Sequence, residues 1–89
     1  MKKKDLKKLS DRIETLMRIT HPYEIASVCA NPRADTIDVT IEFVPMCKPA
    51  HDNADMSVCI ALENILTRYG RCLDHKRQGR IHTFQYQIA

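Results

Sequence analysis

The segment from Asp52 to Gly70 constrains the fold most, because its residue pattern fits one amphipathic helix. At about 100° per residue, its larger apolar residues fall on one face and its charged residues fall elsewhere. That face consists of Val58, Cys59, Leu62, Ile65, Leu66 and Tyr69. Gly70 is expected to end the helix in the left-handed conformation. The segment therefore predicts a helix packed against a core that the rest of the chain supplies.

Two apolar residues of this helix, Met56 and Ile60, lie outside the buried face. They are four positions apart, so they stack on the side opposite the core. One interpretation is that they are scattered surface residues, or are covered by the loop before the helix. The other is that they form the edge of a partner or dimer surface.

A second helix is predicted near the N-terminus, from about Asp5 to Thr20. Its apolar residues recur at helical spacing, and it should stop before His21-Pro22, since a residue preceding proline is pushed out of helical geometry. The stripe consists of Leu6, Leu9, Ile13, Leu16 and Met17, extended by Thr20. Residues 1–4 are expected to be a frayed basic end.

Two segments alternate strictly between apolar and polar residues and predict half-buried strands, Thr36–Val44 and Ile81–Ile88. In the second, the face that carries His82, Phe84 and Tyr86 should be buried. Each strand has a weaker predecessor, from Tyr23 to Ala30 and from Arg71 to Lys76. The turns are expected at Asn31–Asp35 and around Gly79.

The predicted element order is helix, strand, strand, helix, strand, strand. This order predicts an α+β two-layer domain, with a four-stranded antiparallel sheet covered on one face by both helices. Eighty-nine residues suffice for a single domain, residues 1–89, with one modest core. No apolar run is long enough to cross a membrane and no export signal is evident, so we predict a cytoplasmic protein.

The four cysteines are expected to be free thiols, with Cys29 and Cys59 as small core residues. Two Cys/His pairs, Cys47 with His51 and Cys72 with His75, supply four zinc-type ligands. Their spacings match no common zinc finger, and three positions along a regular strand point Cys72 and His75 to opposite faces. We therefore predict no metal cofactor.

Enzymatic chemistry has little support in the sequence. The sets Cys47, His51, Asp52 and Cys72, Asp74, His75 contain nucleophile, base and acid types, but adjacency in sequence is not catalytic geometry. The chain has only two glycines and no phosphate-cradling loop. We predict no enzymatic activity.

Binding through charge is one of two functional hypotheses. The net charge is +3, and basic residues gather at the N-terminus and around the second predicted hairpin. These residues are Lys2, Lys3, Lys4, Lys7, Lys8, Arg68, Arg71, Lys76, Arg77 and Arg80. Clustered Lys and Arg side chains can neutralise phosphates, so a nucleic-acid-binding protein is the alternative prediction.

Binding to protein is the leading hypothesis. Its basis is the exposed pair Met56 and Ile60, Met46 in a proline-bracketed loop, and the free edges of an open sheet. We predict a small non-enzymatic adaptor, regulator or inhibitor that acts through protein contacts, with a homodimer expected.

Overall fold

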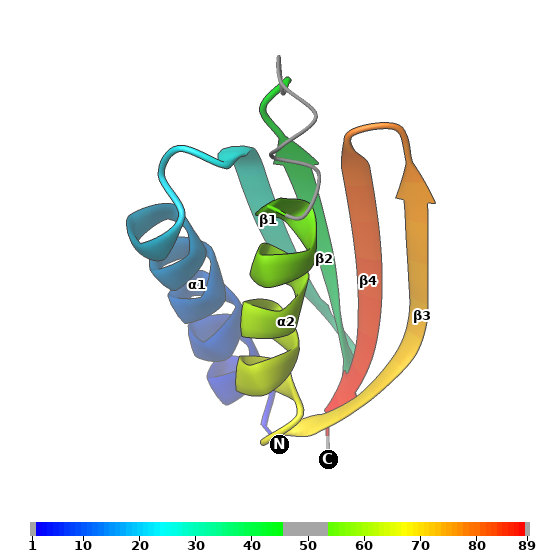
Figure 1. Ribbon diagram of the computed structural model, residues 1–89. Helices are drawn as coiled ribbons and strands as arrows, with labels where there is room; N and C mark the ends of the chain where they lie inside the picture. Colours follow the sequence, from blue (N-terminus) through cyan, green and yellow to red (C-terminus); the bar gives the residue numbers. More distant parts are fainter. Residues whose placement is uncertain (1, 46–53, 89) are drawn as a thin grey trace.

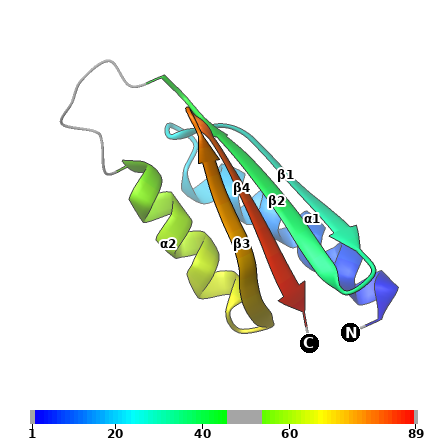
Figure 2. The same ribbon diagram turned by 90° about the vertical axis from the view of Figure 1, so that its right-hand side faces the viewer.

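The computed structural model describes residues 2–45 and 54–88. They form two helices and a four-stranded antiparallel sheet in the predicted order (Figure 1), and both helices lie on the same side of the sheet (Figure 2). The elements are α1 (Lys3–Thr20), β1 (Ile25–Arg33), β2 (Thr36–Phe43), α2 (Ala54–Leu66), β3 (Gly70–Gln78) and β4 (Ile81–Ile88). The strand order is β1-β2-β4-β3, which leaves β1 and β3 at the edges. Among the described residues, neither helix is long and apolar enough to span a bilayer.

The core lies between the helices and the sheet, and the predicted apolar faces build it. Leu62 from α2, Phe43 from β2 and Phe84 from β4 all belong to one buried cluster. The alternation predicted for β4 is confirmed, because His82, Phe84, Tyr86 and Ile88 are buried while their neighbours are not. On α1 the stripe is narrower than predicted, since Leu16 is only half-buried and Thr20 is exposed.

Strand β1 extends further than predicted and includes Asn31 and Pro32. The predicted turn at Asn31–Asp35 is wrong, because only Ala34 and Asp35 separate the paired residues Arg33 and Thr36. Proline is tolerated here because β1 is an edge strand, where the missing N–H removes no hydrogen bond to a neighbour.

The prediction that Gly70 ends a helix in the left-handed conformation is also wrong. Helix α2 ends at Leu66, and Gly70 has no positive φ and begins β3. A Cβ at this position would overlap the backbone carbonyl of Gln87 on the neighbouring strand. The glycine therefore permits close approach of β3 to β4, not the reversal of the chain.

Strands β3 and β4 form a hairpin whose turn contains Gly79 with φ +62°, as the sequence predicted. A register shift between Cys72 and Asp74 marks a bulge at Leu73. Beyond the first residue, every residue of β3 is exposed, because α2 approaches this strand at few positions. The hairpin is therefore held to the domain mainly through β4.

Replacing Gly70 by alanine tests the close approach of the two strands. Gly70→Ala should lower the free energy of unfolding by about 3 kcal/mol, because the added methyl group forces the backbone of β3 away from Gln87. Gly79→Ala meets nothing within 4 Å and should cost only about 1 kcal/mol, from its positive φ. Urea unfolding of both variants measures the difference, and equal costs would contradict this account of Gly70.

Tyr86 carries a buried hydroxyl group that makes no well-formed hydrogen bond among the described residues, and only the Cys72 thiol lies near it as a weak partner. Burial raises the pKa of this hydroxyl above its ordinary value, and nearby Cys72 raises it further. Because the unfolded chain ionises first, Tyr86 should cause stability to fall as the pH rises above about 10.

Tyr86→Phe removes the buried hydroxyl and keeps the ring. It should raise the free energy of unfolding by about 1 kcal/mol at neutral pH and reduce the loss above pH 10. Chemical unfolding at several pH values is the measurement. Tyr23→Phe is the matched control, because Tyr23 is 86% exposed and should change neither quantity. A Tyr86→Phe protein less stable than its parent would refute the proposed cost of the hydroxyl.

Candidate functional site

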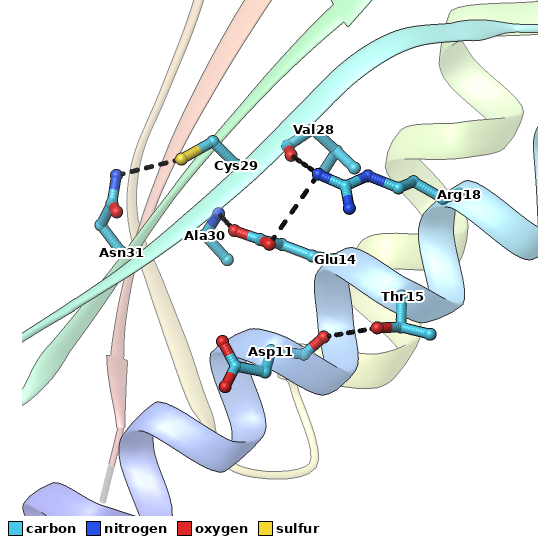
Figure 3. A network of polar contacts seen from close by, with 8 residues as sticks. All are labelled: Asp11, Glu14, Thr15, Arg18, Val28, Cys29, Ala30 and Asn31. Carbon is cyan, nitrogen blue, oxygen red and sulfur yellow. Dashed lines mark hydrogen bonds and ion pairs between the residues drawn. The ribbon is translucent and has the colours of Figure 1, made fainter.

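The two edges of the sheet differ, and the outer edge of β1 is capped by side chains of α1 (Figure 3). Glu14 accepts a hydrogen bond from the backbone N–H of Ala30 at 2.7 Å, and Arg18 donates one to the carbonyl of Val28 at 3.2 Å. Glu14 and Arg18 also form an ion pair at 3.9 Å. These contacts occupy backbone groups that another strand would need, so they block pairing at this edge.

The outer edge of β3 is open at its centre. The two-residue turn makes Gln78 and Ile81 a hydrogen-bonded pair, so the backbone groups of Lys76 also point toward β4 and those of His75 point outward. No side chain or backbone group of the described residues bonds the outward groups of His75. Of the two edge strands, β3 is therefore the one with outward backbone groups that can pair with another strand.

A cluster of Cys59, His75 and His82 lies beside this edge, between α2 and the hairpin. The Nε2 atom of His75 is 3.0 Å from the Nδ1 atom of His82, and the Sγ atom of Cys59 is 3.7 Å from the same Nδ1 atom. All three ligand atoms lie within 4.8 Å of one another. One thiol and two imidazoles form a donor set that suits zinc, so these residues could hold a metal ion.

Two phenylalanine rings fix the imidazoles of the cluster. Phe84 stacks on His75 with ring centroids 4.1 Å apart, and Phe43 meets His82 edge-on at 5.1 Å. His82 is only 5% exposed, Cys59 is half-buried and His75 is exposed. The cluster therefore has a packed inner side and an outer side that solvent reaches.

The sequence did not predict this cluster because strand order and the register of the hairpin decide it. Cys72 pairs with Tyr86 and His75 pairs with Phe84, so both project toward the helices. The expectation that Cys72 and His75 face opposite ways is wrong, since the bulge at Leu73 shifts the alternation by one residue. The signals available in the sequence were the predicted burial of His82 and of Cys59 and the choice of His75 as a zinc-type ligand.

The zinc set predicted from spacing is only partly placed. Cys47 and His51 lie outside the described residues, as do Met46 and Asp52. Cys72 contacts the carbonyl of Asp74 through its sulfur at 3.4 Å, and His75 contacts His82. The structure thus groups His75 with Cys59 and His82 on the helix side of the hairpin.

None of the three cysteines in the described ranges, Cys29, Cys59 and Cys72, forms a disulfide. The prediction of Cys29 as a core residue is wrong, because it is exposed and pairs with Thr40 on the open face of the sheet. That face lies opposite the helices, where alternate side chains of each strand project away from the core.

Asp74 does not join the cluster, because its side chain projects from the open face of the sheet. It pairs with Gln85, whereas His75 pairs with Phe84 on the buried face. The carboxylate lies 3.6 Å from the Nζ atom of Lys76. The set Cys72, Asp74, His75 therefore lacks the arrangement in which an acid orients a catalytic imidazole.

The basic residues are not gathered on one surface. Helix α1 begins at the end of the molecule where both termini lie, while the β3–β4 turn lies at the opposite end (Figure 1). Lys3, Lys4 and Lys7 line a hollow of about 600 Å³ with Arg33, while Arg80 belongs to the opposite turn. The residues predicted to contact nucleic acid thus fall into separate groups, and that prediction stays untested.

The two apolar residues of α2 that lie outside its buried face are exposed, Met56 to 59% and Ile60 to 50%. Helical spacing places Met56 beside Cys59, which reaches the cluster, and places Ile60 beside Met56. The exposed flank of α2 and the helix side of β3 therefore meet at Cys59 and His75. We call this combined region the β3 surface: β3 itself, the cluster, and Met56 and Ile60.

Comparison with known proteins gives no relationship that assigns a role to these residues. No protein family matches the chain, and no curated protein has a significantly similar sequence.

Removal of the Glu14 carboxylate tests the capped edge of β1. Glu14→Ala leaves the Ala30 N–H without its partner and should lower the free energy of unfolding by about 1.5 kcal/mol. Glu14→Gln keeps an acceptor and should lose less. Glu63→Ala, at an exposed position on α2, should change the value by less than about 0.5 kcal/mol. Denaturant titration ranks the three variants, and a Glu14→Ala protein as stable as its parent would show that the cap contributes nothing.

Proposed function

We propose that the chain is a small non-enzymatic protein-binding domain that acts through the β3 surface, and that a second copy of the chain pairs with it along β3. The observation that carries this proposal is the difference between the two edges. Glu14 and Arg18 block β1, whereas the centre of β3 is open. An open edge strand is a common place for a protein to add a strand from a partner.

The charges of β3 favour one register between two copies. Antiparallel strands place residues of the same backbone orientation opposite each other. In a symmetric pair, the residue at the centre of the register lies opposite its own copy. A register centred on Asp74, Lys76 or Arg77 therefore places two like charges opposite each other. A register centred on His75 puts Asp74 of each copy opposite Lys76 of the other, which is favourable at both symmetry-related positions.

The paired arrangement also explains the exposed apolar residues on α2. A two-fold axis perpendicular to the sheet keeps both α2 helices on the same side of the joined sheet. The two β4 strands would lie about 14 Å apart, which is three strand spacings. Met56 and Ile60 of each copy would then flank the junction, where a further protein partner meets apolar surface.

A charge-swap series tests the pairing by sedimentation velocity. Asp74→Lys should weaken the dimer roughly tenfold, because two pairs change from attraction to repulsion and each is worth up to about 1 kcal/mol. Lys76→Asp should do the same. The double variant Asp74→Lys/Lys76→Asp restores both pairs and should recover dimerisation.

Both side chains are at least half exposed, so the fold should tolerate these changes. Lys8→Glu, on the exposed side of α1, is the matched control and should leave the dimer intact. A parent chain that stays monomeric at high concentration, or a double variant that does not recover, would overturn pairing through β3.

A further inference from the structure

We propose that Cys59, His75 and His82 form a zinc-binding site that joins α2 to the β3–β4 hairpin. No step of the strand-pairing proposal requires this site. The proposal starts from three ligand atoms of the preferred types, contributed by three different elements and gathered within 4.8 Å.

The distances are close to those of a tetrahedral ion. Bond lengths of about 2.3 Å for Zn–S and 2.0–2.1 Å for Zn–N imply ligand separations of roughly 3.3–3.6 Å. The cluster already has separations of 3.0 Å between the two histidine nitrogens and 3.7 Å between Cys59 and His82. Binding would need only small shifts, which bring the ligand atoms of Cys59 and His75 closer than the 4.8 Å within which all three atoms lie.

The rings around the cluster hold two ligands in place before an ion arrives. Phe84 restrains His75 by stacking, and the buried ring of His82 is packed against Phe43. Such restraint lowers the entropy that binding would cost, which is how outer groups commonly support metal ligands. The exposure of His75 gives the ion a route from solvent.

Zinc binding changes the protonation of the three ligands. In the metal-free chain, one of the two facing histidine nitrogens carries the hydrogen of the 3.0 Å contact. Zinc needs a lone pair on each, so that ring must shift its proton to its other nitrogen. The Cys59 thiol gives its proton to solvent, so each zinc ion releases one proton. The loaded site carries a net charge of +1, so Arg77, which lies opposite His82 in register, opposes binding electrostatically.

Three protein ligands leave one tetrahedral position for water or for a group from a partner. The structural consequence is a link through the ion between α2 and β3, which make few direct contacts. Zinc should therefore stabilise the whole domain and, in particular, the position of β3 relative to α2.

Zinc titration of the full chain, reduced and freed of metal, tests the site by calorimetry and native mass spectrometry. The parent should bind one ion, and Zn²⁺ should raise its melting temperature. Cys59→Ser and His75→Gln should each weaken binding by at least about tenfold and lose the thermal shift. His75 is exposed, so His75→Gln should leave the fold intact and keeps the test decisive if another variant unfolds.

Two control variants distinguish this site from the set Cys47, His51, Cys72 and His75 that sequence spacing indicates. Cys72→Ser and Cys29→Ser remove exposed thiols and should bind zinc like the parent. With Co²⁺ as the probe, sulfur-to-metal charge-transfer absorption should appear in the parent and in Cys72→Ser but not in Cys59→Ser. Loss of binding in Cys72→Ser, or parent-like binding in Cys59→Ser and His75→Gln, would overturn the assignment.

The oligomeric state of the chain distinguishes a failure of the zinc site from a failure of the proposed strand pairing. The charge-swap series changes residues on the open face whose charges favour one register of the paired strands. None of its variants changes a zinc ligand. A chain that dimerises through β3 without binding zinc would overturn only the metal site. A monomeric chain that binds one zinc ion through Cys59 and His75 would overturn only the pairing.

Discussion

The structure depends on burial of one face of a sheet whose central strands are β2 and β4. Ile37, Val39 and Ile41 from β2 and Tyr86 from β4 are fully buried beneath the helices. Each strand alternates, so the apolar face can be covered only from one side, and both helices lie there. Because β1 and β3 are outside this centre, their environments are set by whatever lies beside them.

The two edge strands, β1 and β3, differ in how far the neighbouring helix covers them. Helix α1 packs along β1 and its side chains reach the outer backbone groups of that strand. Helix α2 buries Val58, Leu62 and Leu66 in the core but scarcely covers β3. The exposed side of β3 is therefore a consequence of where the helices sit. The surface that we propose as functional results from the same packing that stabilises the domain.

Residue patterns predicted most of the fold because solvent exposure repeats along each element. The bounds of β4 and the centre of each helix's buried face follow from apolar periodicity alone, although Leu16, Cys59 and Ile65 are only half-buried. Local exceptions were not predictable in this way. Pro32 fits in β1 only because the strand is at an edge, and Gly70 is required by Gln87, a residue 17 positions away. Both depend on strand order, which periodicity does not contain.

The candidate site shows the same limit more sharply. Cys59, His75 and His82 come from α2, β3 and β4, so their meeting requires the order of the strands and the register of the β3–β4 hairpin together. The two-residue turn at Gly79 and Arg80 pairs His75 with Phe84 and so directs its imidazole toward the helices, whereas the bulge turns Cys72 to the same side. Strand order and the position of the turn together thus decide whether three dispersed side chains form a site.

His75 has a place in both proposals, through different atoms. Its imidazole points toward the helices and meets His82, whereas its backbone groups point outward from the sheet edge. A strand that paired with the backbone would leave the imidazole available, and an ion bound to the imidazole would leave the backbone available. A metal held between α2 and β3 would also fix the edge strand in the position that pairing requires. The two proposals are therefore separable by mutation but would reinforce each other in the assembled protein.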